Sequence, residues 1–510
     1  MRSTAASAPP PVEGEDEALN FIRALHRAPH ASFASAGDLD WSRAPSFLPA
    51  SLGAGLVALP AAEPPWQSGA ARDDALGALG RWLAVSLSCH RTRLAVGRGH
   101  GEAAVPGARR AIASGGAAYP TDLYLRFGAE WAAVSPVLPN HWWLYLPHRH
   151  SLAAHCAAEP AGADDRVEAT LVTVLSRTAF KYREFAYRLS AVDTGVAIGR
   201  LAAGLAAGGA AFEAIGPEDE RGPPLIEPEE QVAGRLICRF PGALNLWSEA
   251  PVEAVPLRVD AGHEARRAAI SAGQPAMFAA LAKAPRRFGA APEPSIPIPA
   301  SGERIALPDP PVGRRRCFAA IVHARRSEAS AFTGVPVPLA ALAGCLRAAS
   351  RALVPLRGFT GDPGIALGCA LIGVQGAAPV AGLLDPQAGA IQVSRTGSAA
   401  DLLNRAMLLH AFDMRQCGFV IHMIADVDGS FLRGGPGGYR RTQIGVGAML
   451  DAATLAAVEA GLSAHAFLGF SAPELALLYD LDPQGSVLPV AQLCVGTAGH
   501  SNQWETAIVG

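Results

Sequence analysis

Apolar positions along this 510-residue chain follow two different periods, which predict strands and helices in alternation. Short runs dense in apolar, aromatic and β-branched residues predict strands at DLYLRF, HWWLYLP, GCALIGV, AGAIQVS and LPVAQLCVG. Apolar residues at helical spacing predict amphipathic helices in DDALGALGRWLAVSLS and VPLAALAGCLRAAS. Helices and strands thus alternate, and we expect an α+β fold in which helices cover a central sheet.

The pattern occurs twice. One segment, YRLSAVDTGVAIGRLAAGLAAGGAAF, begins at Tyr187, and another, YRRTQIGVGAMLDAATLAAVEAGLSAHAF, begins at Tyr439. Each has Tyr-Arg, then a glycine eight residues after the tyrosine (Gly195 and Gly447), and then an alanine-rich helix. Alanine-rich helices can resemble each other by accident. Because the two amphipathic helices upstream correspond in the same order, we favour a tandem duplication.

The same pattern suggests domain boundaries. Residues 1–16 predict a flexible tail, and residues 286–313, rich in Pro, Gly and Ser, predict an extended linker. We therefore expect a first domain over 17–285 and a second over 314–510. The most apolar stretches, around 196–215 and 364–384, are interrupted by charged or polar residues, and they predict buried helix and strand rather than membrane spans.

Composition narrows the possible partners. A net charge of -2 predicts no general affinity for nucleic acid or for an anionic membrane. The eight cysteines are scattered without a CxxC pair, which argues against a zinc ribbon or a disulfide framework and is typical of a reducing cytosol. His141, His148 and His150 lie together but have no Cys or acidic partner at ligand spacing, so we predict no metal site. The N-terminal MRSTAASAPPPVEGEDE lacks the apolar run of a signal peptide, and we expect a cytoplasmic protein.

Lysine is rare here, since 41 of the 43 basic residues are arginine. One of the two lysines, Lys181, stands beside Tyr182 in FKYREFAYR. A partly buried lysine can lose its proton near neutral pH, whereas an arginine cannot, which makes Lys181 the first candidate for a general base. The alternative is that an arginine-biased genome left two lysines by chance, and Lys283 keeps that explanation open.

A glycine-rich segment is the second candidate for chemistry. In RRAIASGGAAYPTDLYLRF, Ser114, Gly115 and Gly116 can bring several backbone N–H groups to one point, and Arg110 stands close enough to add charge. Such a segment suits a phosphate or the edge of a flavin, although Ser-Gly-Gly is also an ordinary turn. In the second half, Arg325, Arg326 and Ser327 of ARRSEASAFTG suit a phosphate dianion, or else mark a charged helix end.

SGGAAYPTDLYL, followed by FKYREFAYR and DTG, resembles the flavin-dependent azoline dehydrogenases of the nitroreductase superfamily, often called SagB-type. Those enzymes carry a segment like R-x-x-P-S-G-G-A-L-Y-P-x-E-x-Y and a later K-Y-x-x-x-x-Y-R. This chain departs from the pattern at three places: Ala113 replaces the usual Pro, Asp122 falls near the usual glutamate, and Val196 stands where a histidine is common.

The resemblance implies tandem nitroreductase-like domains, each with a central, mainly antiparallel sheet flanked by helices. It implies FMN as the cofactor, Lys181 and Tyr182 as catalytic residues, and FMN binding by Arg110 and the Ser-Gly-Gly segment 114–116. ARRSEASAFTG is similar to the nitroreductase opening R-R-S-x-R-x-F, whose arginines commonly grip the flavin phosphate. That similarity implies the same role for residues 325–327.

The two halves differ in complementary ways. The second half has Arg433 and Gly434 where the first has Lys-Tyr, and it has no Ser-Gly-Gly segment. The first half lacks a clear Arg-Arg-Ser opening. Because nitroreductase-like proteins are usually homodimers with flavin at the subunit interface, we expect an internal pseudo-dimer with one flavin site built from both halves.

The function implied by the resemblance is oxidation of thiazoline or oxazoline rings to thiazole or oxazole in a ribosomally made peptide. The implied partners are an azoline-containing precursor peptide and a cyclodehydratase that forms the rings. Two alternatives stay open: an NAD(P)H-dependent nitroreductase-like flavin oxidoreductase, and a flavin-free scaffold subunit of a peptide-modifying complex.

Overall fold

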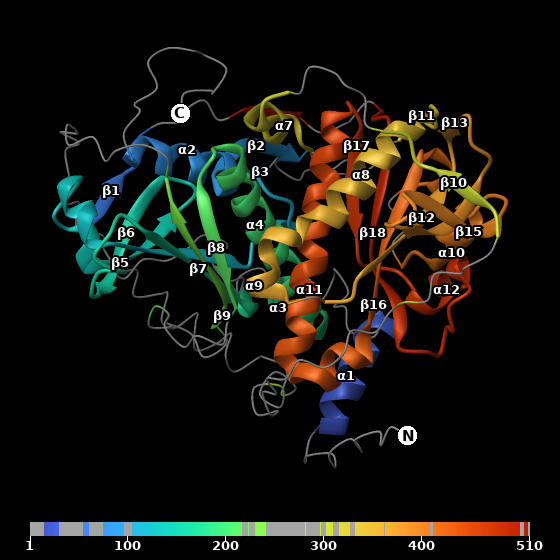
Figure 1. The fold of residues 1–510 in the computed structure, drawn as a ribbon, viewed down its shortest axis with the longest axis horizontal. Helices are drawn as coiled ribbons and strands as arrows, with labels where there is room; N and C mark the ends of the chain where they lie inside the picture. Colours follow the sequence, from blue (N-terminus) through green and yellow to red (C-terminus); the bar gives the residue numbers. More distant parts are fainter. Residues whose placement is uncertain are drawn as a thin grey trace.

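Two sheets, one from each half of the chain, flank a central pair of long helices in the computed structural model (Figure 1). The structure describes residues 15–29, 55–60, 75–95, 105–216, 223, 230–240, 281, 296, 302–309, 316–326, 332–361, 363–408, 412–499 and 504–507.

The elements up to residue 240 are α1 Glu15–Arg27, β1 Leu56–Ala58, α2 Ala75–Leu87, β2 Cys89–Ala95, β3 Val105–Arg110, β4 Thr121–Phe127, β5 His141–Leu146, β6 Ser151–Ala157, β7 Val167–Val174, α3 Leu175–Tyr182, α4 Ala186–Ala207, β8 Ala211–Ile215 and β9 Glu230–Arg239. The predicted helix at 73–88 is α2, and the predicted strands DLYLRF and HWWLYLP are β4 and β5.

The later elements are β10 Arg304–Ala306, α7 Phe318–Ala324, β11 Val337–Pro338, α8 Leu339–Ala352, α9 Arg357–Thr360, β12 Ala366–Leu371, β13 Val374–Gln375, β14 Val380–Asp385, β15 Ala390–Thr396, α10 Ala400–Ala406, β16 Phe419–Asp426, α11 Val427–Glu459, β17 Ser463–Phe467, α12 Ala472–Ala476, β18 Val487–Gly496 and β19 Trp504–Ala507. The predicted second-half helix is α8, and the predicted strands lie at β12 to β13, β15 and β18.

The two large sheets have the same topology. The first has the strand order β1-β6-β5-β4-β7-β9-β8, and the second has β10-β15-β14-β12-β16-β18-β17. Counted along the chain within each half, these orders are identical, and neighbouring strands pair antiparallel in both sheets. The repeated order supports the predicted duplication.

The central helices α4 and α11 cross at the two glycines that the sequence repeat picked out. A Cβ on Gly195 would collide with the main chain of Ile444, and a Cβ on Gly447 would collide with the main chain of Val192. About two helical turns earlier, the rings of Tyr187 and Tyr439 stack with centroids 6.1 Å apart and an interplanar angle of 7°. Equivalent residues of the two halves therefore meet each other, as they do across the two-fold axis of a homodimer.

The correspondence extends back to the lysine. A backbone kink separates α3 from α4 at Arg183, with φ 45°, and the same kink interrupts α11 at Gly435, with φ 58°. Tyr187 and Tyr439 are separated by the same 252 positions as these two kinks (183 to 435 and 187 to 439). By that offset, Arg433 is the counterpart of Lys181.

Both ends of the chain cross to the opposite half. Helix α1 lies against α11 and α12 (Figure 1), where the Arg23 guanidinium pairs with the Asp428 carboxylate at 2.8 Å and His26 Nε2 lies 2.9 Å from Tyr439 Oη. The last strand, β19, pairs antiparallel with β2 of the first half. The apolar face of α1, with its leucines buried, thus joins the core of the second half rather than its own.

These contacts change the predicted boundaries. Within the predicted domain 17–285, α1 packs on the second half, and within 314–510, β19 belongs to a sheet of the first. Residues 15–16 of the predicted tail begin α1, while residues 1–14 lie outside the described part of the chain. Residues 304–306 of the predicted linker form the edge strand β10, because Ile305 packs against the second core.

Two helical stretches, Leu175–Ala207 and Leu339–Thr360, are long and apolar enough to cross a membrane by length and composition alone. In the first, 78% of the most apolar window is buried inside the protein, as the central position of α4 requires.

Candidate functional site

A cavity of about 340 Å³ is built by residues of both halves. Its walls are formed by His90, Arg91, Arg109, Arg110, Ala111, Ile112, Ala113, Ser114, Gly116, Ala117, Tyr119 and Lys181 from the first half and by Val322, Arg325, Arg326 and His465 from the second. Most of the candidates that the sequence indicated, although they are far apart in the chain, therefore line one space.

The Ser-Gly-Gly segment forms the short 3-10 turn Gly115–Ala117 just before β4. Gly116 has φ 59°, and a Cβ there would lie 2.5 Å from Tyr182 Oη and 2.8 Å from Lys181 Nζ. Both the backbone angle and the close approach favour glycine at this position. The glycine thus lets the main chain approach the Lys181 and Tyr182 side chains.

Lys181 and Tyr182 are the last two residues of α3 and are both partly buried. Burial lowers the pKa of the Lys181 ammonium, and the positive charge of Arg109 lowers it further. Burial raises the pKa of the Tyr182 hydroxyl to about 12, with the Asp193 carboxylate adding to the effect. The lysine is therefore more readily deprotonated than an exposed one, and the tyrosine keeps its proton.

A buried carboxylate lies beneath the glycine segment. Asp193, on α4, accepts a hydrogen bond from Ser114 Oγ at 2.6 Å and one from the Gly115 N–H at 3.1 Å. Ser114 Oγ in turn accepts the Tyr119 N–H at 2.9 Å. Burial raises the pKa of Asp193 to about 7, although the hydrogen bonds from Ser114 and Gly115 oppose the shift. Asp193 was not among the site residues predicted from the sequence; the DTG triplet that contains it was the available signal.

The cavity is positively charged, since arginines and a lysine line it and no Asp or Glu is among the described residues that do. The guanidinium of Arg110 stacks on the Tyr119 ring, 4.8 Å from its centroid, and burial lowers the pKa of Arg110. Asp122 stands near the position of the family's usual glutamate. Its carboxylate forms a bidentate salt bridge with the Arg177 guanidinium, with two hydrogen bonds of 2.6 Å each. That carboxylate is thereby neutralised without entering the cavity.

Arg325 joins the two halves. Its Nε donates to the Ala111 carbonyl at 2.9 Å, and its Nη2 lies 3.4 Å from the carbonyls of Arg110 and Ile112. The Ala111 carbonyl also accepts from Arg200 on α4 at 2.8 Å. Arg325 therefore fixes the end of α7 to the segment that leads into the glycine turn, and the cavity is incomplete without the second half.

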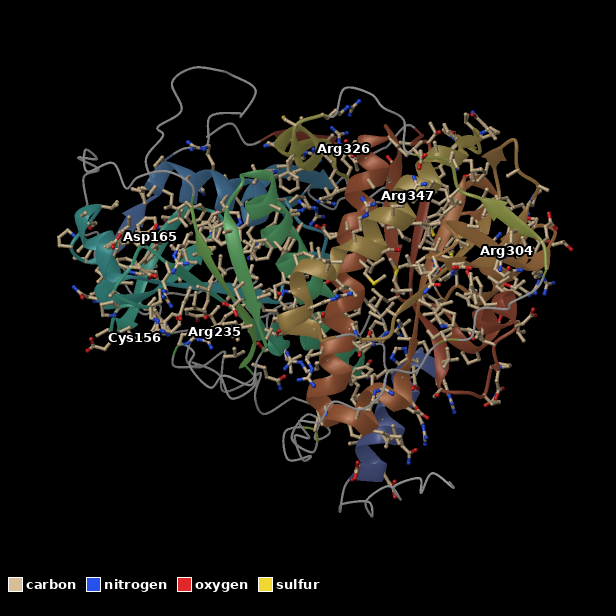
Figure 2. All side chains as sticks on the ribbon, in the orientation of Figure 1. Cys156, Asp165, Arg235, Arg304, Arg326 and Arg347 are labelled. Carbon is tan, nitrogen blue, oxygen red and sulfur yellow. The ribbon has the colours of Figure 1, made fainter. Side chains whose placement is uncertain are left out.

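The other two members of the predicted Arg-Arg-Ser group differ in position. Arg326 is exposed at the end of α7 and lines the cavity, and Figure 2 shows it at the same end of the molecule as that helix. Ser327 lies outside the described residues.

The described residues fit FMN, the group that the sequence resemblance implies. A wall of arginines without a carboxylate suits a phosphate dianion, and the glycine turn leaves main chain open to the close approach of a flat ring. Arg110, Arg326 and the segment 114–116 would hold the cofactor, with Arg325 supporting that segment from behind.

The pseudo-symmetric position in the second half is built differently. The Arg433 guanidinium pairs with Asp426 at 3.3 Å. The segment before β12 packs against β8, so that a Cβ on Gly358 would collide with the Ala214 carbonyl, and the buried ring of Phe359 lies in the core of the first half. In the first half the corresponding segment, before β4, borders the cavity that His465 on β17, the counterpart of β8, also lines. A separate cavity of about 330 Å³ borders Gly361 and Ile365, just before β12.

No protein-family model matches the chain, and no curated protein matches it. A solved structure of a protein from Anabaena variabilis, assigned as a nitroreductase, aligns over 94% of this chain and 99% of its own with a TM-score of 0.70 and 16% identity. This likeness shows that the chain has a nitroreductase-like fold, and it confirms the predicted fold class.

Two further solved structures align less well. A protein from Ralstonia eutropha, also assigned as a nitroreductase, covers 43% of this chain and 99% of its own at 19% identity and a TM-score of 0.31. An E. coli microcin synthetase complex, McbBCD with truncated pro-MccB17 bound, covers 34% and 71% at 18% identity and a TM-score of 0.28. These TM-scores are too low to bear on the fold.

Proposed function

We propose that this protein is a cytoplasmic, FMN-dependent dehydrogenase that oxidises thiazoline or oxazoline rings to thiazole or oxazole in a ribosomally made peptide. The observation that carries the proposal is the meeting of Lys181 and Tyr182 with Gly116 at one cationic cavity. The order of these motifs in the sequence supports the azoline substrate, and the nitroreductase-like fold supports a flavin.

The reaction removes a hydride from one ring carbon and a proton from its neighbour; the hydride carries away the two electrons of its own C–H bond, and the electrons of the C–H bond that loses the proton form the new ring double bond. Bound FMN supplies the hydride acceptor, and molecular oxygen is the terminal oxidant that we propose. The Lys181 amine, with its pKa lowered by burial, takes the proton. Tyr182 keeps its own proton and donates a hydrogen bond that orients the ring.

We propose one such site per chain, because the Lys-Tyr pair and the Ser-Gly-Gly segment both occur in the first half alone. Arg433 stands at the position that corresponds to Lys181 and is paired with Asp426, so the second half offers no comparable base, although a second cavity of about 330 Å³ borders Gly361 and Ile365 just before β12. We expect one FMN per chain in purified protein. A flavin-to-chain ratio near two, measured from flavin absorbance and protein concentration, would contradict the single site.

The test of Lys181 uses a precursor peptide whose rings have been formed by a cyclodehydratase, the proposed partner. In Lys181→Arg the charge stays and the base is removed, so we expect FMN to bind while the peptide no longer loses two hydrogen atoms per ring, as followed by mass spectrometry. The matched control is Arg433→Lys at the related position, for which we expect unchanged oxidation. Near-normal turnover by Lys181→Arg would refute the proposed role.

The same preparation separates the alternatives. Steady NAD(P)H consumption with a nitroaromatic compound, without azoline oxidation, would indicate a nitroreductase-like oxidoreductase. A protein without absorbance in the flavin band, even after incubation with FMN, would indicate a scaffold subunit.

A further inference from the structure

We infer that Asp193 is a positioning residue, whose carboxylate holds the segment 114–119 in the one conformation that brings its glycine main chain against Lys181 and Tyr182. The inference rests on the proposed function, because it assigns Asp193 to the flavin site. It concerns a residue on a central helix that lies one layer below the cavity.

Asp193 holds the start of the segment directly and its end through Ser114. At its start, the carboxylate accepts the Ser114 hydroxyl at 2.6 Å and the Gly115 N–H at 3.1 Å. At its end, the Tyr119 N–H donates to the same Ser114 Oγ at 2.9 Å. The single carboxylate of Asp193 therefore stabilises the turn from the side of α4.

The enclosed residues are in backbone conformations that do not persist unaided. Gly116 has φ 59°, and the non-glycine residues Ala117 and Tyr119 have φ 56° and 46°. Residues with side chains rarely adopt such angles, and they keep them only where the surrounding structure fixes them. This strained stretch is spanned by the hydrogen bonds that Asp193 accepts from Ser114 and Gly115 and by the one that Ser114 Oγ accepts from Tyr119, together with the main-chain bonds of the turn itself.

Asp193 also differs from three other buried carboxylates. Asp122, Glu168 and Asp451 are each paired with an arginine. Asp193 is buried, and in the described part of the chain its hydrogen-bond partners are the neutral donors of Ser114 and Gly115. A buried carboxylate without a cation disfavours folding whenever it is ionised, so its presence points to a role in the site.

The experiment compares Asp193→Asn, which keeps one acceptor, Asp193→Ala, which keeps none, and Ser114→Ala, which removes the link to Tyr119. The control is Asp413→Asn, a carboxylate that accepts the Arg415 N–H at 2.9 Å on the exposed surface of the second half. Two quantities are measured: amide hydrogen exchange of the peptide covering 111–119 without flavin, and the Kd for FMN.

In the alanine variants we expect exchange in 111–119 to accelerate about tenfold and the Kd for FMN to rise about tenfold, as expected for one lost charge-assisted hydrogen bond. Asp193→Asn should fall between them and the wild type, the control should match the wild type, and exchange in α11 should not change.

Three outcomes would overturn the inference: unchanged exchange in 111–119, an unchanged FMN affinity in a wild type that binds FMN, or faster exchange spread equally over α4 and α11, which indicates a general packing role. Failure of the proposed function has a different signature. A wild type that binds no FMN, but whose 111–119 segment loosens in Asp193→Ala, would refute the flavin site and leave the positioning of this segment by Asp193 standing.

Discussion

The buried carboxylate of Asp193 should make the stability of the protein depend on pH, and its removal should abolish that part of the dependence. Burial raises the pKa of Asp193 from 3.8 to about 7. Between these values the folded protein holds a proton that the unfolded chain releases, so the contribution to stability is complete below about pH 4 and is lost as the pH rises through 7. In Asp193→Asn the side chain is neutral throughout.

The pKa shift of about three units corresponds to a full effect of about 4 kcal/mol at roughly 1.4 kcal/mol per unit. Between about pH 5 and pH 8, the wild type should lose about 2.5 kcal/mol of unfolding free energy relative to Asp193→Asn. Taking the difference between the two proteins cancels the contributions of the buried histidines, such as His90 and His422, whose pKa values are lowered by burial.

The assay is equilibrium unfolding in urea at several pH values, without FMN and with unchanged ionic strength. The unfolding free energy of Asp193→Asn should rise relative to that of the wild type as the pH increases from acid to alkaline values. Two free-energy curves that run parallel from about pH 5 to pH 8 would refute the reasoning, because they would mean that Asp193 ionises in the folded protein at no cost.

Three substitutions, one of them with a matched control, test further features of the structure. Gly116→Ala should fold and yet lose FMN affinity and activity, because its Cβ would lie 2.5 Å from Tyr182 Oη; normal activity would contradict the close approach. Arg183→Gly should raise the unfolding free energy by about 1 kcal/mol, since Arg183 is exposed and has φ 45°; an unchanged melting temperature would argue against strain there. Gly447→Ala should lower the unfolding free energy by more than about 2 kcal/mol, because main chain faces main chain at that position, whereas Gly344→Ala, with open space around it, should be neutral or stabilising. Equal effects of these last two would contradict the helix crossing.

Local pattern was enough to predict the elements and their repetition. The strands β4, β5, β15 and β18 and the helices α2 and α8 are where apolar spacing placed them. The repeat of Tyr187 at Tyr439 proved to be a contact between equivalent residues. Such features depend on each segment's own sequence, which is why they can be read without knowledge of the rest.

Other features depend on partners that no spacing reveals. The amphipathic face of α1 indicates a helix that packs somewhere, but the choice of the second half is made by Asp428 and Tyr439, more than 400 residues later in the chain. Arg325 matches a phosphate-binding pattern, yet part of its guanidinium holds main-chain carbonyls. Asp193 reads from sequence as a polar residue on a helix, and only the fold places it under the glycine turn.

The crossing of the two ends has a consequence for how the protein can be made. A chain cut within 286–301 would yield one piece that carries α1, which docks on the other piece, and a second piece that carries β19, which completes a sheet of the first. Each fragment would supply what the other lacks, and the α4–α11 crossing would hold them together. We therefore expect two separately encoded polypeptides, produced in the same cell, to assemble into the complete site without a peptide bond between them.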